Sequence, residues 1–197
     1  MSRVSTALLA ACLLPAAALA APQTYVLDSL HSYPNFSVNH LGMSTIHGRF
    51  DKMTGEFTID EAAKTGSLEV KIATASVTTG DNVRTGDAGR SRDAHLRTAD
   101  FFNSAEFPEM TFKSTKLNFK GDTVESIDGN LTLLGVTKPV KLNVTLFKCG
   151  PHPFSKKPMC GGDAEGTIKR TDFGMKFGVP AIGDEVKLQI NMEAYPK

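Results

Sequence analysis

Apolar and polar residues alternate with a period of two along most of the chain, which is typical of strands that bury one face. The alternation begins at Tyr25 and Leu27 and ends in a run through Val186, Leu188 and Ile190. Turn sequences such as MTG, AKTG, KGD and IGDE separate the runs. About eight short strands without helical crossovers predict an all-β fold, an antiparallel sandwich or barrel.

One long stretch, residues 78–108, breaks the alternation. Within it, the sequence DAHLRTADFF (93–102) predicts one or two short helical turns with Asp93 as the N-cap. Large apolar residues that need burial stand among a set of charged and polar ones, namely Arg92, Asp93, His95, Arg97 and Asp100.

This set of polar side chains is typical both of a buried structural corner and of a functional site. An irregular segment across a barrel leaves backbone donors and acceptors that need partners, and buried polar side chains can supply them. We therefore interpret the set as a structural corner. Contact with a ligand head group and catalysis are the alternatives.

Residues 1–20 are typical of a secretory signal peptide, with Arg3, an apolar run and Ala18-Leu19-Ala20 before the cleavage site. The alternative is a lipobox that would make Cys12 a lipidated N-terminus. Cleavage after Ala20 leaves residues 21–197 as one domain, without another apolar stretch near the ~20 residues that span a bilayer.

The charge balance argues against a nucleic-acid partner. Removing Arg3 from 22 Lys and Arg leaves 21, against 21 Asp and Glu. A nucleic-acid surface needs a clustered excess of basic residues.

Cys149 and Cys160 are the remaining cysteines, and in an exported chain their spacing predicts a disulfide. The segment between them contains three prolines and is expected to be irregular. A metal or redox pair is the rival interpretation, but it needs C-x-x-C or further ligands.

Catalytic and metal motifs are missing from the sequence. It contains no G-x-S-x-G, H-E-x-x-H, P-loop or G-x-G-x-x-G pattern, and its five histidines lack ligand spacing. We therefore expect no catalytic residues, no metal and no cofactor.

Twelve Phe and no Trp make the expected core unusual. A closed barrel of about eight strands leaves an interior that holds side chains or one small ligand. A lumen lined by Phe, Leu, Met and Ile suits an elongated apolar molecule, whereas the other interpretation is a core that these side chains fill.

Several blocks, in order, resemble the YceI-like family of bacterial periplasmic polyisoprenoid-binding proteins. They run from YVLDSLHSYPNFSVNHLGMSTIHGRF (25–50) through RDAHLRTADFFNSAEFPEMTFKS (92–114) and GNLTLLGVTKPVKLNV (129–144) to IKRTDFGM (168–175). The resemblance implies an extended, lipocalin-like antiparallel β-barrel with a long apolar channel, a periplasmic location and a bound isoprenoid lipid. True lipocalins carry a G-x-W motif that this chain lacks.

We therefore predict a non-covalent carrier of a polyprenyl chain or a quinone tail, monomeric or homodimeric, with transient contact to a membrane or to a membrane protein. The alternatives are a stress-response scaffold or adaptor with a filled core and a periplasmic hydrolase or protease that uses His95, Asp93 and Asp100. The residues predicted to line the channel are Phe36, Val38, Met43, Phe50, Phe57, Leu96, Phe101, Phe102, Phe112, Leu131, Leu133 and Phe173.

Overall fold

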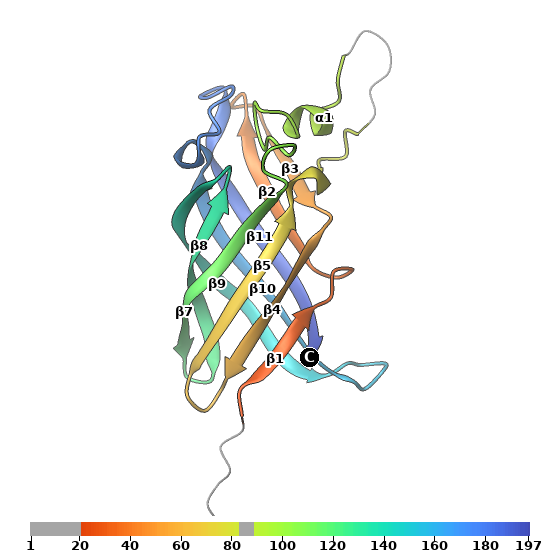
Figure 1. Cartoon of the computed structure of the whole chain (residues 1–197), viewed down its shortest axis with the longest axis vertical. Helices are drawn as coiled ribbons and strands as arrows, with labels where there is room; N and C mark the ends of the chain where they lie inside the picture. The colour runs from red at the N-terminus through yellow and green to blue at the C-terminus, as the bar shows by residue number, and fades with distance from the viewer. Residues whose placement is uncertain (1–20, 83–88) are drawn as a thin grey trace, which may run out of the picture.

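A computed structural model describes residues 21–82 and 89–197, which form one closed β-barrel (Figure 1). The expected signal peptide, its cleavage site and Cys12 lie outside the described residues. The strands are β1 (Gln23–Leu27), β2 (Tyr33–His40), β3 (Ser44–Phe50), β4 (Met53–Asp60), β5 (Thr65–Ala73), β6 (Val77–Thr78), β7 (Glu109–Lys120), β8 (Thr123–Leu133), β9 (Val136–Pro151), β10 (Pro158–Lys169) and β11 (Ile182–Pro196). Three short helices are described with them: η1 (Thr74–Ser76), α1 (Arg92–Leu96) and η3 (Arg170–Phe173).

The barrel closes because β1 pairs with β11, at the far end of the order β1-β4-β5-β7-β8-β9-β10-β11. Beyond β1, the strand β2 pairs with the same edge of β11, β3 pairs with β2, and β6 pairs with β3. The pairs β1/β2, β3/β4 and β5/β6 therefore act as three long, bent strands. All pairings are antiparallel, so the predicted all-β antiparallel barrel of about eight strands is confirmed.

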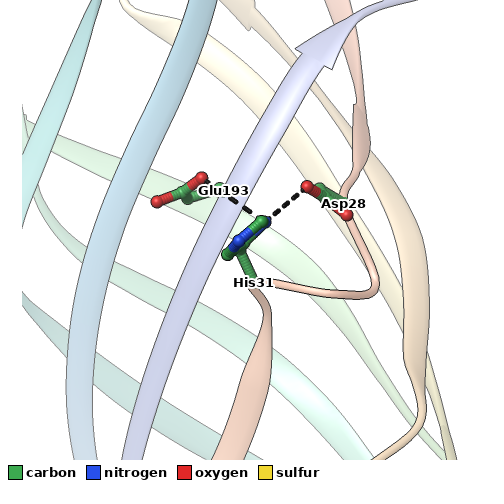
Figure 2. Close-up of side chains that lie close together, drawn as sticks. All are labelled: Asp28, His31 and Glu193. Carbon is green, nitrogen blue, oxygen red and sulfur yellow. Dashed lines mark hydrogen bonds and ion pairs between the residues drawn. The ribbon is translucent and has the colours of Figure 1, made fainter. Parts of the chain in front are cut away.

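The bend between β1 and β2 is fixed to β11 by hydrogen bonds. The Ser32 hydroxyl is fully buried, donates to the Glu193 carbonyl and accepts from the Glu193 N–H, both at 3.1 Å. His31 lies between two carboxylates, with its Nδ1 2.7 Å from Asp28 Oδ2 and 3.9 Å from Glu193 Oε2 (Figure 2). This Asp28–His31–Glu193 cluster joins β1, β2 and β11 at the point where the barrel closes.

The stretch between β6 and β7 is irregular, as expected, and α1 provides the predicted helical turn. The N-cap is Ser91, whose hydroxyl accepts from the Ala94 N–H, so the prediction of Asp93 as N-cap is wrong. Asp93 stands inside the first turn of α1, where its side chain points inward and is fully buried.

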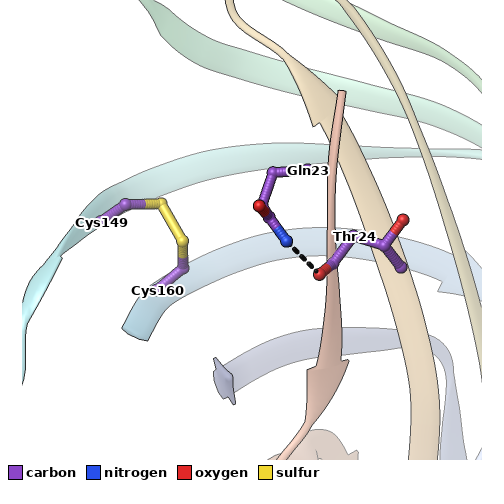
Figure 3. The surroundings of a disulfide bond; sticks show 4 residues. All are labelled: Gln23, Thr24, Cys149 and Cys160. Carbon is purple, nitrogen blue, oxygen red and sulfur yellow. Dashed lines mark hydrogen bonds between the residues drawn. A yellow bond between two sulfur atoms is a disulfide. The ribbon is translucent and has the colours of Figure 1, made fainter. Parts of the chain in front are cut away.

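The predicted disulfide joins Cys149 on β9 to Cys160 on β10. These residues are register partners, and the strands continue past them to Pro151 and Pro158, so the irregular part of the hairpin is shorter than expected. The bond lies beside the first residues of β1, at the end of the barrel opposite α1 (Figures 1 and 3). Within the two described ranges, no helix is long and apolar enough to span a membrane.

The Asp28–His31 contact is expected to make the stability of the barrel depend on pH. The hydrogen bond from His31, followed by one from the Leu30 N–H, lowers the pKa of Asp28. This contribution to stability is therefore present above the ordinary aspartate pKa and is lost as the pH falls through the lowered value. The hydrogen bond to Asp28 raises the pKa of His31. That contribution is complete below the ordinary histidine pKa and is lost as the pH rises through the raised value.

We expect His31→Ala to lower the free energy of unfolding most at about pH 5, between the ordinary pKa values of the two groups, and less toward acid and alkaline pH. Urea unfolding across the pH range measures this difference. Asp28→Asn is the control and should remove the same pH dependence. A difference between His31→Ala and wild type that stays constant across the range would contradict the assignment.

Candidate functional site

The barrel encloses a cavity of about 470 Å³, a size that is typical of small-molecule sites. Its wall follows the alternation of the strands, because inward residues of a barrel recur with a period of two. The regular part of the wall includes Leu68, Val70 and Ile72 of β5, Val140 and Leu142 of β9, and Val186, Leu188, Ile190 and Met192 of β11.

Most residues predicted to line the channel do lie in this wall. They come from strands on both sides of the barrel and from the segment between β6 and β7. They are Phe36, Val38, Phe50, Leu96, Phe101, Phe102, Phe112, Leu131 and Leu133.

Three predicted lining residues lie elsewhere. Met43 is in the β2–β3 turn, where 89% of its surface is exposed, because the strand alternation ends before the turn. Phe173 is buried in η3 but outside the cavity wall. After η3 the chain reverses at Gly174, which has a φ of +88°, and Met175 and Phe177 line the cavity instead.

Phe57, the third of these residues, belongs to the packed end of the barrel below the cavity. Its ring stacks on Tyr25 at 5.0 Å between centroids and meets Phe147 edge-on at 6.0 Å. We call these three rings the aromatic floor. They lie near the disulfide and the start of β1, so they close the cavity at that end.

The opposite end, beside α1, reaches the surface. Arg90 and Phe177 both line the cavity and are both exposed, and we call this end the mouth. Phe102 packs against Phe50 at 5.1 Å and against Phe36 at 6.5 Å between ring centroids. The irregular segment therefore covers part of the mouth with aromatic rings.

Two glycines make room for large rings on the inner face. A Cβ at Gly48 would collide with the ring of Phe36, and a Cβ at Gly129 with the ring of Phe112. Each Phe ring thus lies flat over a neighbouring strand, which keeps the lumen open at these levels.

Asp93 is the buried centre of the polar corner. Its carboxylate accepts hydrogen bonds from the Thr79 N–H at 2.8 Å, the Thr79 hydroxyl and the Thr78 hydroxyl. Arg92 donates from Nε to the Thr79 hydroxyl at 2.7 Å. These bonds tie α1 to the end of β6.

Arg97 and His95 brace the same segment. Arg97 donates to the carbonyls of Ala75 and Val77 at 2.8 and 2.9 Å. His95 Nε2 is 2.7 Å from Asp100 Oδ2, and this hydrogen bond, with a smaller contribution from Arg90, lowers the pKa of Asp100.

Arg170 is a cavity-lining residue that the sequence interpretation missed. It is 3% exposed and donates to the carbonyls of Gly183, Met175 and Ile182. Burial lowers the pKa of its guanidinium group. Its position in the IKRTDFGM block was the signal that could have found it. The missed lining residues of β11 were visible as an alternating run.

The Asp28–His31–Glu193 cluster offers one imidazole nitrogen and two carboxylates, all within 4.8 Å of one another. One divalent cation could be held there, but only after the Nδ1 proton shared with Asp28 had been displaced. The arrangement observed is a hydrogen-bonded link between strands.

A closed antiparallel barrel with an apolar interior, packed at one end and accessible at the other, defines a lipocalin-like barrel. The YceI-like domain family matches residues 25–194. The Protein YceI sequences of Escherichia coli O6:H1 and Salmonella arizonae are each 40% identical to this chain over 177 residues, covering 89% of this chain and 87% of the relative. The chain therefore belongs to the YceI-like family.

Solved structures share the fold. The YCEI protein of Campylobacter jejuni matches with a TM-score of 0.63 and 27% identity, covering 81% of this chain and 89% of its own. BcnA of Burkholderia cenocepacia matches with a TM-score of 0.67 and 22% identity, covering 85% and 98%. A polyisoprenoid binding domain from Saccharophagus degradans matches with a TM-score of 0.62 and 21% identity, covering 89% and 99%.

Removal of the Asp93 carboxylate should destabilise the protein. Asp93→Ala leaves the Thr79 N–H and two hydroxyls without their buried acceptor, so we expect a loss of about 3 kcal/mol in the free energy of unfolding. Arg92→Ala should also lower the melting temperature, because it removes donors to Thr79. Urea unfolding measures the loss.

Asp100→Ala is the matched control, because it removes a more exposed carboxylate from the same segment, and it should cost much less. If Asp93→Ala proves as stable as wild type, the structural role assigned to the corner is wrong.

Proposed function

We propose that the protein is a non-covalent binder and carrier of an isoprenoid lipid, either a polyprenyl chain or a quinone tail. The observation that carries the proposal is the apolar cavity of about 470 Å³ inside a closed barrel. Leu, Val, Ile, Phe and Met side chains of five or more strands line its depth, and these suit a branched hydrocarbon chain.

The distribution of polar groups sets the orientation of the ligand. Of the polar residues that line the cavity, Thr79, Arg90, Ser91, Arg92 and His95 come from the segment beside the mouth, whereas Asn35 and His40 lie on β2 and Arg170 lies on η3. An apolar tail would enter first and lie toward the aromatic floor, while a polar head would stay near α1.

Similarity to known proteins supports the ligand class. The matching barrel from Saccharophagus degradans is described as a polyisoprenoid binding domain. Because the two chains are only 21% identical, this match shows a shared fold and no more. The ligand assignment therefore rests on the cavity and on membership of the YceI-like family.

The energetics allow tight binding. One isoprene unit has about five carbons, and burial at roughly 0.8 kcal/mol per CH₂ gives about 4 kcal/mol per unit. Eight units would exceed the affinity ceiling of about 18 to 21 kcal/mol, so ordering of the flexible chain must consume much of the gain. Enough should remain for the ligand to survive purification.

The polar corner supports binding without catalysis. Asp93 directs its carboxylate to Thr78 and Thr79, whereas His95 bonds to Asp100. Both carboxylates thus take part in contacts that hold the segment in place, which supports a structural role for the corner.

We also propose a periplasmic location. The Cys149–Cys160 disulfide needs an oxidising compartment, and the first twenty residues have the composition of an export signal.

Organic extraction followed by mass spectrometry tests the proposal on protein purified from a bacterial periplasm. We expect an isoprenoid lipid from wild type and at least about a tenfold loss from Leu133→Asp, because a carboxylate in the cavity wall would be buried against hydrocarbon. Leu188→Trp should lower the lipid content by filling space without adding charge.

Leu146→Asp is the matched control, because Leu146 is 53% exposed on β9 and outside the cavity wall. Circular dichroism verifies that each variant is folded. Wild-type protein that yields no isoprenoid, or folded Leu133→Asp with the wild-type lipid content, would refute the proposal.

A further inference from the structure

Exposed apolar side chains gather around the mouth of the cavity. Leu41 and Met43 in the β2–β3 turn are 53% and 89% exposed, and Phe177 and Val179 before β11 are 45% and 37% exposed. We call the two turns that carry them, residues 41–43 and 174–181, the apolar rim. Large apolar side chains grouped at one exposed place on a protein mark an interaction site more often than single ones do.

One hydrogen bond joins the two turns of the rim, and one further hydrogen bond stabilises each turn internally. The Leu41 N–H donates to the Ala181 carbonyl at 2.7 Å, and the Ile182 N–H donates to the Gly178 carbonyl at 2.7 Å. The Asn39 side chain accepts from the Gly42 N–H at 2.8 Å. The four apolar side chains are therefore presented by one fixed surface.

Leu41 has an unfavourable backbone conformation for its side chain. Its φ is +60°, a region that favours glycine and asparagine, and a leucine there is uncommon. Burial does not offset this cost, because the side chain is half exposed.

The apolar rim is continuous with the cavity wall. Phe177 belongs to both, and its ring lies 5.3 Å from Phe101 and 5.0 Å from His95 between centroids. His40 and Ile182, which flank the two turns in sequence, also line the cavity. An apolar surface thus runs from the outside of the mouth into the lumen.

The charge of the rim fits a phospholipid surface. The sequences LGM (41–43) and GMKFGVPA (174–181) contain a single charged residue, Lys176. A lysine beside apolar side chains is typical of segments that dip into a bilayer, because its amine reaches the anionic head groups while the apolar groups enter the acyl boundary.

We propose that the protein docks mouth-first on a phospholipid bilayer, with the apolar rim inserted at the boundary between head groups and acyl chains. An isoprenoid chain could then pass between the bilayer and the cavity without crossing water. This inference rests on the proposed function, since it names the surface from which the ligand is taken or to which it is delivered.

Vesicle flotation tests the docking, with vesicles of phosphatidylethanolamine and phosphatidylglycerol and the mature protein. Wild type should float with the vesicles. The double variant Leu41→Asn, Met43→Asp should bind about tenfold or more weakly, because neither side chain would remain apolar. Neither residue lines the cavity, so the lipid content after purification should stay as in wild type.

Phe154→Asp is the matched control. Phe154 is 90% exposed in the β9–β10 hairpin, at the opposite end of the barrel, and its substitution should leave flotation unchanged. Met43→Gln provides a milder variant, with a smaller loss of binding, if the double variant unfolds early in a thermal melt.

The docking proposal is overturned if wild type does not float, if the folded rim variants float as well as wild type, or if Phe154→Asp loses binding to the same extent. Self-association that the double variant abolishes, without vesicle binding, would assign the rim to a second copy of the chain and overturn the docking proposal too. Organic extraction of the purified protein distinguishes a failure of the docking proposal from a failure of the proposed function. Isoprenoid in a protein that does not float defeats docking alone, whereas rim-dependent flotation with no extractable isoprenoid supports docking and defeats the proposed ligand.

Discussion

The pairing of β11 with both β1 and β2 is the constraint on which the rest of the structure depends. It joins the last strand of the meander to the first and closes the ring, while the order of strands ends at the two-residue β6, which pairs with β3. In a closed ring, every second side chain must face inward, and in this barrel those side chains leave a cavity of about 470 Å³. The cavity is thus a consequence of closure, and the buried Ser32 hydroxyl and the Asp28–His31–Glu193 cluster stabilise the junction that makes it.

The two ends of the barrel are packed in different ways. At the end near the disulfide, Phe57 stacks on Tyr25 of the neighbouring strand and meets Phe147 of β9 edge-on. At the other end β6 and β7 diverge, and the segment between them covers the gap with Phe101 and Phe102 below and polar bracing above. The buried carboxylate of Asp93 makes this possible, because it satisfies Thr78 and Thr79 where regular pairing stops.

The sequence predicts most of the strands and most of the cavity wall, since alternation specifies both together. Phe36, Val38, Phe112, Leu131 and Leu133 all follow from the period-two pattern and line the cavity. The corner could also be located, because charged residues interleaved with large aromatics indicate polar groups that are buried with partners. The identity of its cap could not be predicted, since Ser91 and Asp93 are both good caps and only the packing of α1 decides between them.

The period-two alternation does not show how deep in the barrel a residue lies or which path a turn takes. Phe57 faces inward as the alternation predicts, but it lies at the level of the aromatic floor, which depends on strand stagger. Met43 and Phe173 lie in turns, where period two no longer applies. The chain's reversal at Gly174, which brings Met175 and Phe177 into the wall, depends on a left-handed residue that the alternation does not encode.

A crystal structure of the protein purified from a bacterial periplasm tests the central claim most directly. We predict continuous, elongated non-protein electron density in the lumen, running from Phe102 beside the mouth to Leu68, which pairs with Phe57 at the aromatic floor. A lumen that side chains have collapsed to fill, with no such density, would contradict the claim and favour a barrel with a filled core.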